Sequence, residues 1–370
     1  MTLGDPVIQG KNTGGEYNVL AYGASSGGSA ATNTAAIQSA IDAAEAAVGS
    51  DSDLGVCVYI PGGTYDINAG LTLQAGRISI VGDGKYATMI RQTGAADLLT
   101  INTSGAGRVG VRNLGLYFEG SGTRCAIKVD HGGGKINNGL LNNLYVDSFP
   151  IGIEITGSPQ GGFWIISDCA FEGGEYGIYS NYGFGIFLVA SSTFHAASTA
   201  AIYLRDTNCA AGSACGDFTI SGCNFDGGSS TFGVYVNNST VGYAGNFNIS
   251  GNKFDAFASG SGHPVYLVSC SAFKVLGNSY CGGALLADQA VTLSSCSNYV
   301  IDYEDRTNAD PNVNEFGFAI QGAPPKIKLD RTSVGGWDIY IDPYDKLIFA
   351  DSVSGKGIRI TNAGAIEYVT

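Results

Sequence analysis

The chain has 370 residues and a formal net charge of −13 at pH 7, with 56 glycines and only 14 % charged residues. A chain this acidic is poorly suited to nucleic acid, whose phosphates require basic side chains, and no segment reaches the roughly 18 apolar residues of a membrane-spanning helix. Abundant glycine for tight corners, together with 17 phenylalanines and 20 tyrosines, predicts an all-β chain of short strands.

The N-terminal part of the chain combines a short tail, two strands and one helix. Residues 1–15 have neither the basic nor the apolar region of a secretory signal, so we expect the chain to fold in a cytoplasm. In "ATNTAAIQSAIDAAEAAVGS" apolar side chains recur at helical spacing, at Ile37, Ile41, Ala44 and Val48. This spacing predicts one amphipathic helix between the strands of "EYNVLAYGA" and "VCVYIPGGTYDINAGLTL".

From about residue 108 onward, a two-part phrase recurs along the chain. Its first part ends in an aromatic residue and is found in "ISDCAF", "VASSTF", "ISGCNF", "ISGNKF" and "VLGNSY". Its second part alternates apolar with polar residues, in "GIEIT", "GIYSN", "AIYLR", "GVYVN", "PVYLV" and "AVTLS". Coils of about 22 to 31 residues, none able to bury its apolar face alone, are expected to stack into one continuous core.

Cys169 and Cys223 occupy the position in this phrase where Asn252 and Asn278 stand in later copies. We interpret the two cysteines as packing residues inside a corner, since their spacing is that of the coil and no histidine accompanies them. Nine cysteines is an odd number, and a reducing compartment keeps thiols free, so buried thiols are expected rather than a disulfide framework.

The coil phrase ends at "EDRTNADPN", and a different pattern follows. Residues 313–370 contain short alternating strands separated by Gly, Asn and Asp turns. The chain is therefore divided into a tail over residues 1–15, a solenoid with its N-terminal cap over 16–312, and a small β-rich module over 313–370.

The N-terminal segment resembles that of the pectate-lyase-like superfamily, in "YNVLAYGA", "NTAAIQSAIDAA" and "VYIPGGTYDI". This superfamily includes polygalacturonases and many bacteriophage tailspikes. The resemblance implies a right-handed parallel β-helix whose open end is covered by the helix, which keeps a core strand edge from being exposed. Tailspikes that resemble this chain are homotrimers held together by C-terminal modules, and we expect that trimerisation role for residues 313–370.

In the second part of the phrase, alternate residues point away from the core. Four tyrosines then fall in one outward column, roughly 14 Å long at about 4.8 Å per coil, and three polar residues border it. The tyrosines are Tyr179, Tyr203, Tyr235 and Tyr266, and the polar residues are Asn181, Arg205 and Asn237. Because a tyrosine offers an apolar face to a sugar ring and a hydroxyl for hydrogen bonding, the column predicts an oligosaccharide groove. A contact between subunits, or an aromatic ladder that stabilises the sheet, would explain the same pattern.

The residue after the aromatic of the first part forms a second outward column. Its members are Glu119, Glu172, His195, Asp226, Asp255 and Cys281. Carboxylates one or two coils apart are separated by roughly 5 to 10 Å, a range that glycosidases use. With Glu175 in the turn that leads to the tyrosines, the candidate catalytic acids are Glu172, Glu175, Asp226 and Asp255. Outward charges that only keep a solenoid soluble are the alternative.

Other chemistry is less well supported. In the resembling polygalacturonases the catalytic aspartates occupy the turn where "GGEYGI" stands here, but the paired-aspartate, glycine-histidine-glycine and arginine-isoleucine-lysine motifs are absent. A lyase would need a basic residue, and between residues 136 and 300 only Arg205, Lys253 and Lys274 could supply one. The three histidines are scattered and no nucleotide motif is present, so neither a metal nor a cofactor is expected.

We therefore expect a bacteriophage tailspike, a receptor-binding protein that recognises and hydrolyses a polysaccharide of the host surface. Its expected partners are host lipopolysaccharide or capsule, tail or baseplate proteins of the phage, and two further copies of the chain, with no nucleic acid and no membrane insertion. The protein would be assembled in the host cytoplasm and act outside the cell as part of the virion. Two alternatives stay open: a secreted polysaccharide-degrading glycosidase or lyase, and a non-enzymatic adhesin that binds glycan.

Overall fold

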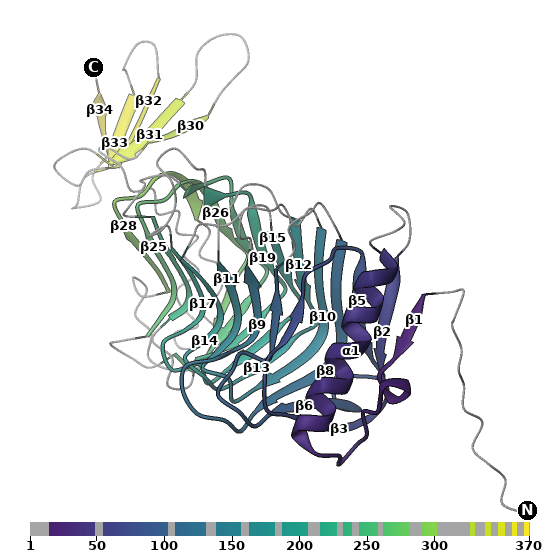
Figure 1. Cartoon of the computed structure of the whole chain (residues 1–370). Helices are drawn as coiled ribbons and strands as arrows, with labels where there is room; N and C mark the ends of the chain where they lie inside the picture. Colours follow the sequence, from purple (N-terminus) through teal and green to yellow (C-terminus); the bar gives the residue numbers. More distant parts are fainter. Residues whose placement is uncertain are drawn as a thin grey trace, which may run out of the picture.

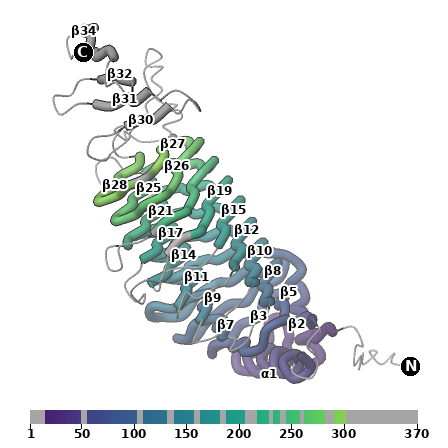
Figure 2. Tube along the Cα trace, turned by 90° about the horizontal axis from the view of Figure 1, so that it is seen from above, coloured from purple at the N-terminus to yellow at the C-terminus, as the bar shows by residue number. Residues whose placement is uncertain are grey.

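The structure of the chain, a computed structural model (Figure 1), describes residues 15–48, 55–102, 108–130, 138–156, 163–181, 187–205, 215–227, 232–238, 244–257, 262–281 and 290–301, and the strands of a C-terminal sheet. These residues form a parallel β-solenoid with a single α-helix near the N-terminus, which confirms the predicted fold class. In Figure 2 the coils follow one another in sequence order along one axis, beginning at the helix.

Nine parallel strands, one from each coil, form one face of the solenoid. They are β4 (Leu71–Leu73), β7 (Leu99–Ile101), β9 (Cys125–Asp130), β11 (Ile151–Thr156), β14 (Tyr176–Ser180), β17 (Ala200–Arg205), β21 (Phe232–Asn237), β25 (His263–Val268) and β28 (Val291–Ser294). Each strand pairs with the next in the same direction, so equivalent residues of successive coils lie side by side.

An 18-stranded sheet forms the other two faces. One face contains β1 (Glu16–Asn18), β2 (Val56–Ile60), β5 (Ile78–Gly82), β12 (Phe163–Ser167), β15 (Phe187–Ala190), β19 (Phe218–Ser221), β23 (Asn248–Ser250), β26 (Ser271–Leu276) and β29 (Ser297–Ile301). The other contains β3 (Gly63–Ile67), β6 (Thr88–Gln92), β13 (Ala170–Glu172), β16 (Thr193–His195), β20 (Asn224–Asp226), β24 (Lys253–Asp255) and β27 (Ser279–Cys281). The long strands β8 (Arg108–Phe118) and β10 (Asn138–Asp147) pair with strands of both faces and turn the corner at Asn113 and Asn143, whose φ values are 59° and 52°. A separate pair consists of β18 (Cys215–Gly216) and β22 (Ala244–Gly245).

The helix α1 (Ala30–Val48) covers the first coil, as the sequence predicted (Figure 1). Ile37 and Ile41 are fully buried on its inner side. Gln38 accepts a hydrogen bond from the Thr72 amide at 2.8 Å and donates to the Thr72 carbonyl at 3.0 Å, which satisfies the free edge of β4. The short helix η1 (Val19–Tyr22) precedes α1. The cap therefore buries apolar surface and also covers a strand edge that could otherwise pair with a strand of another chain.

The aromatic residue that ends the first part of the phrase points into the core. Phe171, Phe194, Phe225, Phe254 and Tyr280 form one stack with ring centroids 4.8, 5.0, 4.7 and 5.3 Å apart. A parallel stack joins Phe187, Phe218, Phe247, Phe273 and Tyr299 at 5.3, 4.4, 5.0 and 5.1 Å. Stacked aromatic pairs contribute about 0.5–1.5 kcal/mol each beyond the area they bury, so these columns favour the observed register.

Cys169 and Cys223 are packing residues, as predicted. They are 2 % and 3 % exposed, and their thiols donate to the carbonyls of Ser167 and Ser221 at 3.2 and 3.5 Å. Burial raises the pKa of the Cys223 thiol to about 11 and that of Cys169 to about 12, so both stay protonated. The cysteines whose side chains the structure describes are all free thiols.

In the next coils asparagines occupy the position of these two cysteines. The side chain of Asn252 accepts from the Cys223 amide at 2.9 Å and donates to the Ile220 carbonyl at 3.0 Å. Asn278 repeats both bonds one coil later, with the Asn252 amide at 3.0 Å and the Ile249 carbonyl at 2.9 Å. Each side chain thus satisfies backbone groups that the turn leaves unpaired inside the core.

The described strands near the C-terminus form a sheet of a different kind. They are β30 (Lys326–Leu329), β31 (Trp337–Ile341), β32 (Leu347–Asp351), β33 (Gly357–Ile360) and β34 (Ile366–Val369), and each is antiparallel to the next. The tail at residues 1–14 and the segment at residues 302–325, which contains the predicted boundary at 312, lie outside the described residues.

Replacing Asn252 with Ala should lower the free energy of unfolding by about 2–4 kcal/mol, because two backbone groups would be buried without partners. Lys253→Ala is the matched control, since this neighbouring side chain is 49 % exposed and its loss should change stability by no more than about 0.5 kcal/mol. Denaturant unfolding measures both. An Asn252→Ala protein as stable as the Lys253→Ala protein would show that the corner asparagines are dispensable.

Candidate functional site

The nine-stranded face carries the outward tyrosine column that the sequence predicted. In register the column reads Glu154, Tyr179, Tyr203, Tyr235 and Tyr266. We call this surface the tyrosine face. Because side chains alternate along each strand, these residues all point outward. Because the strands pair without a register slip, the residues of successive coils form one continuous column.

The tyrosine rings touch along the column. Tyr203 and Tyr235 stack with centroids 4.5 Å apart and planes 6° apart. Tyr179 meets Tyr203 at 5.7 Å, and Tyr235 meets Tyr266 at 5.0 Å. All four rings are half-buried rather than fully exposed, because each is covered in part by its neighbours. Burial raises the pKa of Tyr179 and of Tyr235, so their hydroxyls remain protonated donors.

Three further rings widen the tyrosine face, and the sequence interpretation missed them. Tyr176 lies 4.9 Å from Tyr179, Phe232 lies 4.7 Å from Tyr235, and His263 lies 5.3 Å from Tyr266. Each stands three residues before its tyrosine, because these strands begin with a half-buried outward residue followed by two buried ones. Strict alternation hides such a position, although a ring three residues before a tyrosine in three coils is a signal that could have revealed it.

Polar side chains border the tyrosine face at the ends of its strands. Asn237 donates to the Tyr235 hydroxyl at 3.1 Å, and the Arg205 guanidinium lies 5.9 Å from the centroid of the Tyr203 ring. Arg205 and Asn237 are partners in register. Oδ1 of Asn181 and Nε of Arg205 are buried without a hydrogen-bond partner among the residues that the structure describes. The predicted rim is thus assembled beside the rings.

Two carboxylates lie against the tyrosine face. Glu175, in the turn before β14, accepts a hydrogen bond from the Tyr176 hydroxyl, and burial together with this carboxylate raises the pKa of Tyr176. Glu154 is next to Tyr179 in register and was not among the predicted site residues. Its Oε2 accepts from the Cys125 thiol at 3.0 Å and lies 3.5 Å from the Lys128 ammonium, and its side chain is only 17 % exposed.

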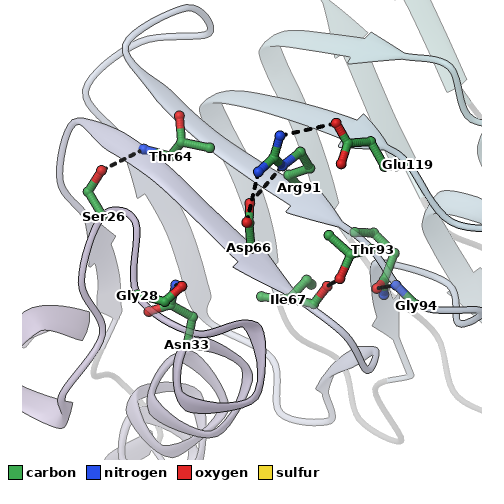
Figure 3. A network of polar contacts seen from close by, with 11 residues as sticks. Ser26, Gly28, Asn33, Thr64, Asp66, Ile67, Arg91, Thr93, Gly94 and Glu119 are labelled. Atoms are coloured by element: carbon green, nitrogen blue, oxygen red, sulfur yellow. Dashed lines mark hydrogen bonds and ion pairs between the residues drawn. The ribbon is translucent and has the colours of Figure 1, made fainter.

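A second outward column follows the adjacent face of the solenoid. In register it reads Asp66, Arg91, Tyr117, Asp147, Glu172, His195, Asp226, Asp255 and Cys281. We call this surface the charged face. Figure 3 shows where it begins: Arg91 binds both carboxylate oxygens of Asp66, at 2.7 and 2.8 Å, and reaches Glu119 at 3.1 Å. The Arg91 guanidinium lowers the pKa of the Asp66 carboxyl.

The predicted place of Glu119 in this column was wrong. Tyr117 and Asp147 precede Glu172 in register, whereas Glu119 follows the end of β8 and pairs with Arg91. Glu119 therefore forms an ion pair with Arg91 in the first coils and does not lie beside Glu172, Asp226 and Asp255.

The error has a simple cause. The sequence interpretation aligned Phe118 with Phe171, but the residue of β8 that lies in line with Phe171 is Leu116. An offset of two residues keeps the inward and outward alternation intact, so the pattern of the sequence does not reveal it.

The four predicted catalytic acids are divided between the two faces. Glu172 and Asp226 flank His195, whose Nδ1 and Nε2 lie 2.8 and 3.4 Å from their carboxylates. Asp255 accepts from Lys253 at 2.9 Å. These three acids lie on the charged face, across a corner of the solenoid from the tyrosines, and only Glu175 contacts a ring of the tyrosine face.

Two properties of the described part of the chain bear on its chemistry. Within it, no group of three or more His, Cys, Asp and Glu side chains could hold a metal ion. No helix there is long and apolar enough to cross a membrane.

The structure is thus a parallel β-solenoid with two outward columns of side chains on adjacent faces. A family model described as rhamnogalacturonase A/epimerase, pectate lyase-like, matches residues 17–227, which is more than half of the chain. The chain belongs to this family. None of the curated proteins matches its sequence significantly.

Several solved structures are similar to the chain. The A-module of mannuronan C-5 epimerase AlgE6 from Azotobacter vinelandii is 16 % identical, with a TM-score of 0.48 over 77 % of this chain and 80 % of that one. The enzymatically active domain of tailspike protein 2 from bacteriophage CBA120 is 10 % identical, with a TM-score of 0.49 over 96 % and 69 %. ORF18 of Geobacillus virus E2 is 15 % identical, with a TM-score of 0.43 over 96 % and 86 %.

Proposed function

We propose that the chain is a receptor-binding β-helix of the bacteriophage tailspike type, which binds a polysaccharide of the host surface along its tyrosine face. The observation that carries this proposal is the unbroken contact of rings from Tyr179 to Tyr266. Rings in contact at about 4.8 Å per coil give a continuous aromatic strip roughly 14 Å long, in which Tyr203 and Tyr235 are parallel and the two outer rings are tilted. This length suits a short stretch of extended sugar chain.

The surroundings of the strip support a glycan over an apolar partner. Tyr179 and Tyr235 keep protonated hydroxyls, which can donate hydrogen bonds to a sugar, and Asn237 bonds to the Tyr235 hydroxyl at the end of its strand. A net charge of −13 favours a neutral or weakly charged polymer. The family model takes its name from a rhamnogalacturonase and an epimerase, which are enzymes of saccharides.

The proposal includes hydrolysis of the bound glycan, with Glu175 and Glu154 as the carboxyl pair. Hydrolysis needs one carboxylate that takes a proton from water as its oxygen attacks the anomeric carbon, and one carboxyl that gives a proton to the leaving oxygen as the glycosidic bond breaks. Glu154 is assigned the first role because it is next to Tyr179 in register and its Oε2 is held by the Lys128 ammonium and the Cys125 thiol. Glu175 lies beside the rings of the same face and is assigned the second role.

A non-enzymatic adhesin is the second candidate. It is favoured by the pairing of the charged-face acids with His195 and Lys253, which gives Glu172, Asp226 and Asp255 a structural explanation. In that case the tyrosine face binds glycan, and none of the carboxyl groups takes part in its hydrolysis.

Replacing Tyr203 with Ala should weaken glycan binding by at least several-fold, because it removes the ring at the centre of the strip. Tyr203→Phe keeps the ring and is the matched control, with a smaller loss. A screen against bacterial surface polysaccharides, followed by titration of the best binder, measures both. If Tyr203→Ala disrupts the oligomer and leaves binding intact, the tyrosine face is a subunit contact.

Glu154→Gln and Glu175→Gln should each reduce the release of reducing ends at least a hundredfold while binding is largely retained, because each change removes a proton-transfer group. Glu172→Gln, Asp226→Asn and Asp255→Asn are the comparison set on the charged face. Loss of turnover in this set alone would move the catalytic acids back to the charged face, and an inactive wild type that still binds glycan would establish the adhesin.

We further propose that the protein is a homotrimer carried on the phage tail or baseplate, with residues 313–370 as its trimerisation module. The described strands of this module are short, so they gain little from packing within one chain. Light scattering should give about three times the chain mass of 38.1 kDa, and removal of residues 313–370 should abolish that species. A single 38.1 kDa species for the intact chain would contradict the trimer.

A further inference from the structure

We propose that Cys270 and Cys296 form a reversible disulfide between the last two coils of the solenoid that the structure describes, made by exchange with a low-molecular-weight disulfide. The bond joins the coil of β25 and β26 to the coil of β28 and β29, at the end of the solenoid from which the chain continues to the C-terminal sheet. Neither thiol belongs to the tyrosine face or to the charged face, so the proposal does not depend on glycan binding.

The two cysteines occupy the same position in successive coils. Before them β25 pairs with β28, and after them β26 pairs with β29, with no offset between the two pairings, so Cys270 lies directly beside Cys296. Ser269 and Ser295, the residues that precede them, have φ values of 55° and 56°, so the chain makes the same turn in both coils. Stacking at about 4.8 Å per coil is within the roughly 4.4–6.8 Å between Cα atoms that a disulfide spans.

Both thiols pack against the core at this corner. Sγ of Cys270 lies 3.3 Å from the Val268 carbonyl oxygen, and Sγ of Cys296 lies 3.4 Å from the Leu267 carbonyl oxygen of the preceding coil. Nδ2 of Asn238, one coil earlier, donates to the Cys270 sulfur at 3.6 Å. Cys270 is thus held between Asn238 and Cys296.

The other corner that contains cysteines has no such pair. Cys169 and Cys223 are separated by the coil that contributes Ser192, whose hydroxyl accepts from the Cys169 amide at 3.2 Å. Two coils correspond to roughly 10 Å, which is too far for a disulfide. The adjacency of two thiols therefore distinguishes the corner of Cys270 and Cys296.

The two thiols differ in accessibility and in acidity. Cys296 is half-buried, whereas Cys270 is only 1 % exposed. A hydrogen bond from the Cys270 thiol, with further bonds from the backbone, lowers the pKa of Cys296 against the effect of its burial. The same side-chain bond and burial raise the pKa of Cys270. Because the thiolate is the attacking form of cysteine, Cys296 reacts first and Cys270 second.

The bond forms by two thiol–disulfide exchanges. The Cys296 thiolate attacks one sulfur of the small disulfide, and the other half leaves as a thiolate. The Cys270 thiol then gives its proton to solvent, its sulfur attacks the mixed disulfide at Cys296, and the second half leaves as a thiolate. Two cysteine thiols are oxidised and one small disulfide is reduced to two thiols. A reducing cytoplasm keeps the pair open, whereas an oxidising environment outside the cell favours the bond.

Peptide mapping of the full chain tests the proposal. The reduced protein is treated with oxidised glutathione at neutral pH and digested with trypsin without reduction. Cleavage at Lys274 separates Cys270 from Cys296, but Cys281 and Cys296 share a tryptic peptide, so Cys281→Ser is mapped beside the wild type. We expect a link between Cys270 and Cys296 in both proteins, and its loss on addition of dithiothreitol. Amide hydrogen exchange in β29 should be several-fold slower in the linked protein than in the reduced one, with exchange in α1 unchanged.

Variants of the pair separate the two exchanges. In Cys270→Ser, glutathione should stay attached to Cys296, because the thiol that displaces it is absent. In Cys296→Ser, no adduct should form on the buried Cys270. The proposal would be overturned by absence of the link in the oxidised wild type, by a lasting glutathione adduct on Cys296 there, or by equal exchange in β29 with and without the link. These three measurements use the unmodified sequence, so they hold even where a variant fails to fold.

Discussion

Parallel pairing in register is the interaction on which the rest of the structure depends. It places each residue beside its counterpart in the next coil at about 4.8 Å, so any residue type repeated in the sequence becomes a continuous surface in space. The same constraint produces the phenylalanine stacks inside, the asparagine and cysteine corner, and the two outward columns. A slip of one residue would turn all of these columns to the opposite side at once.

The corner side chains and the cap make this pairing possible. A parallel strand that ends in a buried turn leaves backbone groups without partners, and Asn252 and Asn278 satisfy them from within. At the N-terminal end, Gln38 and Glu45 of α1 bond to the backbone of the first coil and close its edge. The outward side chains are not needed to satisfy these backbone groups, so the rings of the tyrosine face can contact a ligand.

The sequence could predict what depends on the repeat. The solenoid, the capping helix, the buried cysteines and the tyrosine column all follow from period and alternation, and the structure has them. Strict alternation hides Tyr176, Phe232 and His263, because two buried residues in succession follow each of them within the strand. The sequence also could not reveal the true neighbours of Glu172, because a two-residue offset leaves the pattern unchanged. Glu154 was overlooked because its importance comes from the contacts with Cys125 and Lys128, which lie one coil away. Glu175 lies on the tyrosine face and Glu172 on the charged face because the chain turns a corner between them, and the spacing of the two residues in the sequence does not show this corner.

The proposed function of the protein depends on binding of host polysaccharide by the tyrosine face. Hydroxyl-radical footprinting of the intact protein, with and without the surface polysaccharide that it binds best, tests this residue by residue. We expect protection of Tyr179, Tyr203, Tyr235 and Tyr266 together, with no change at Tyr22 on the capping end. Unchanged labelling of these four rings in the bound state would contradict it.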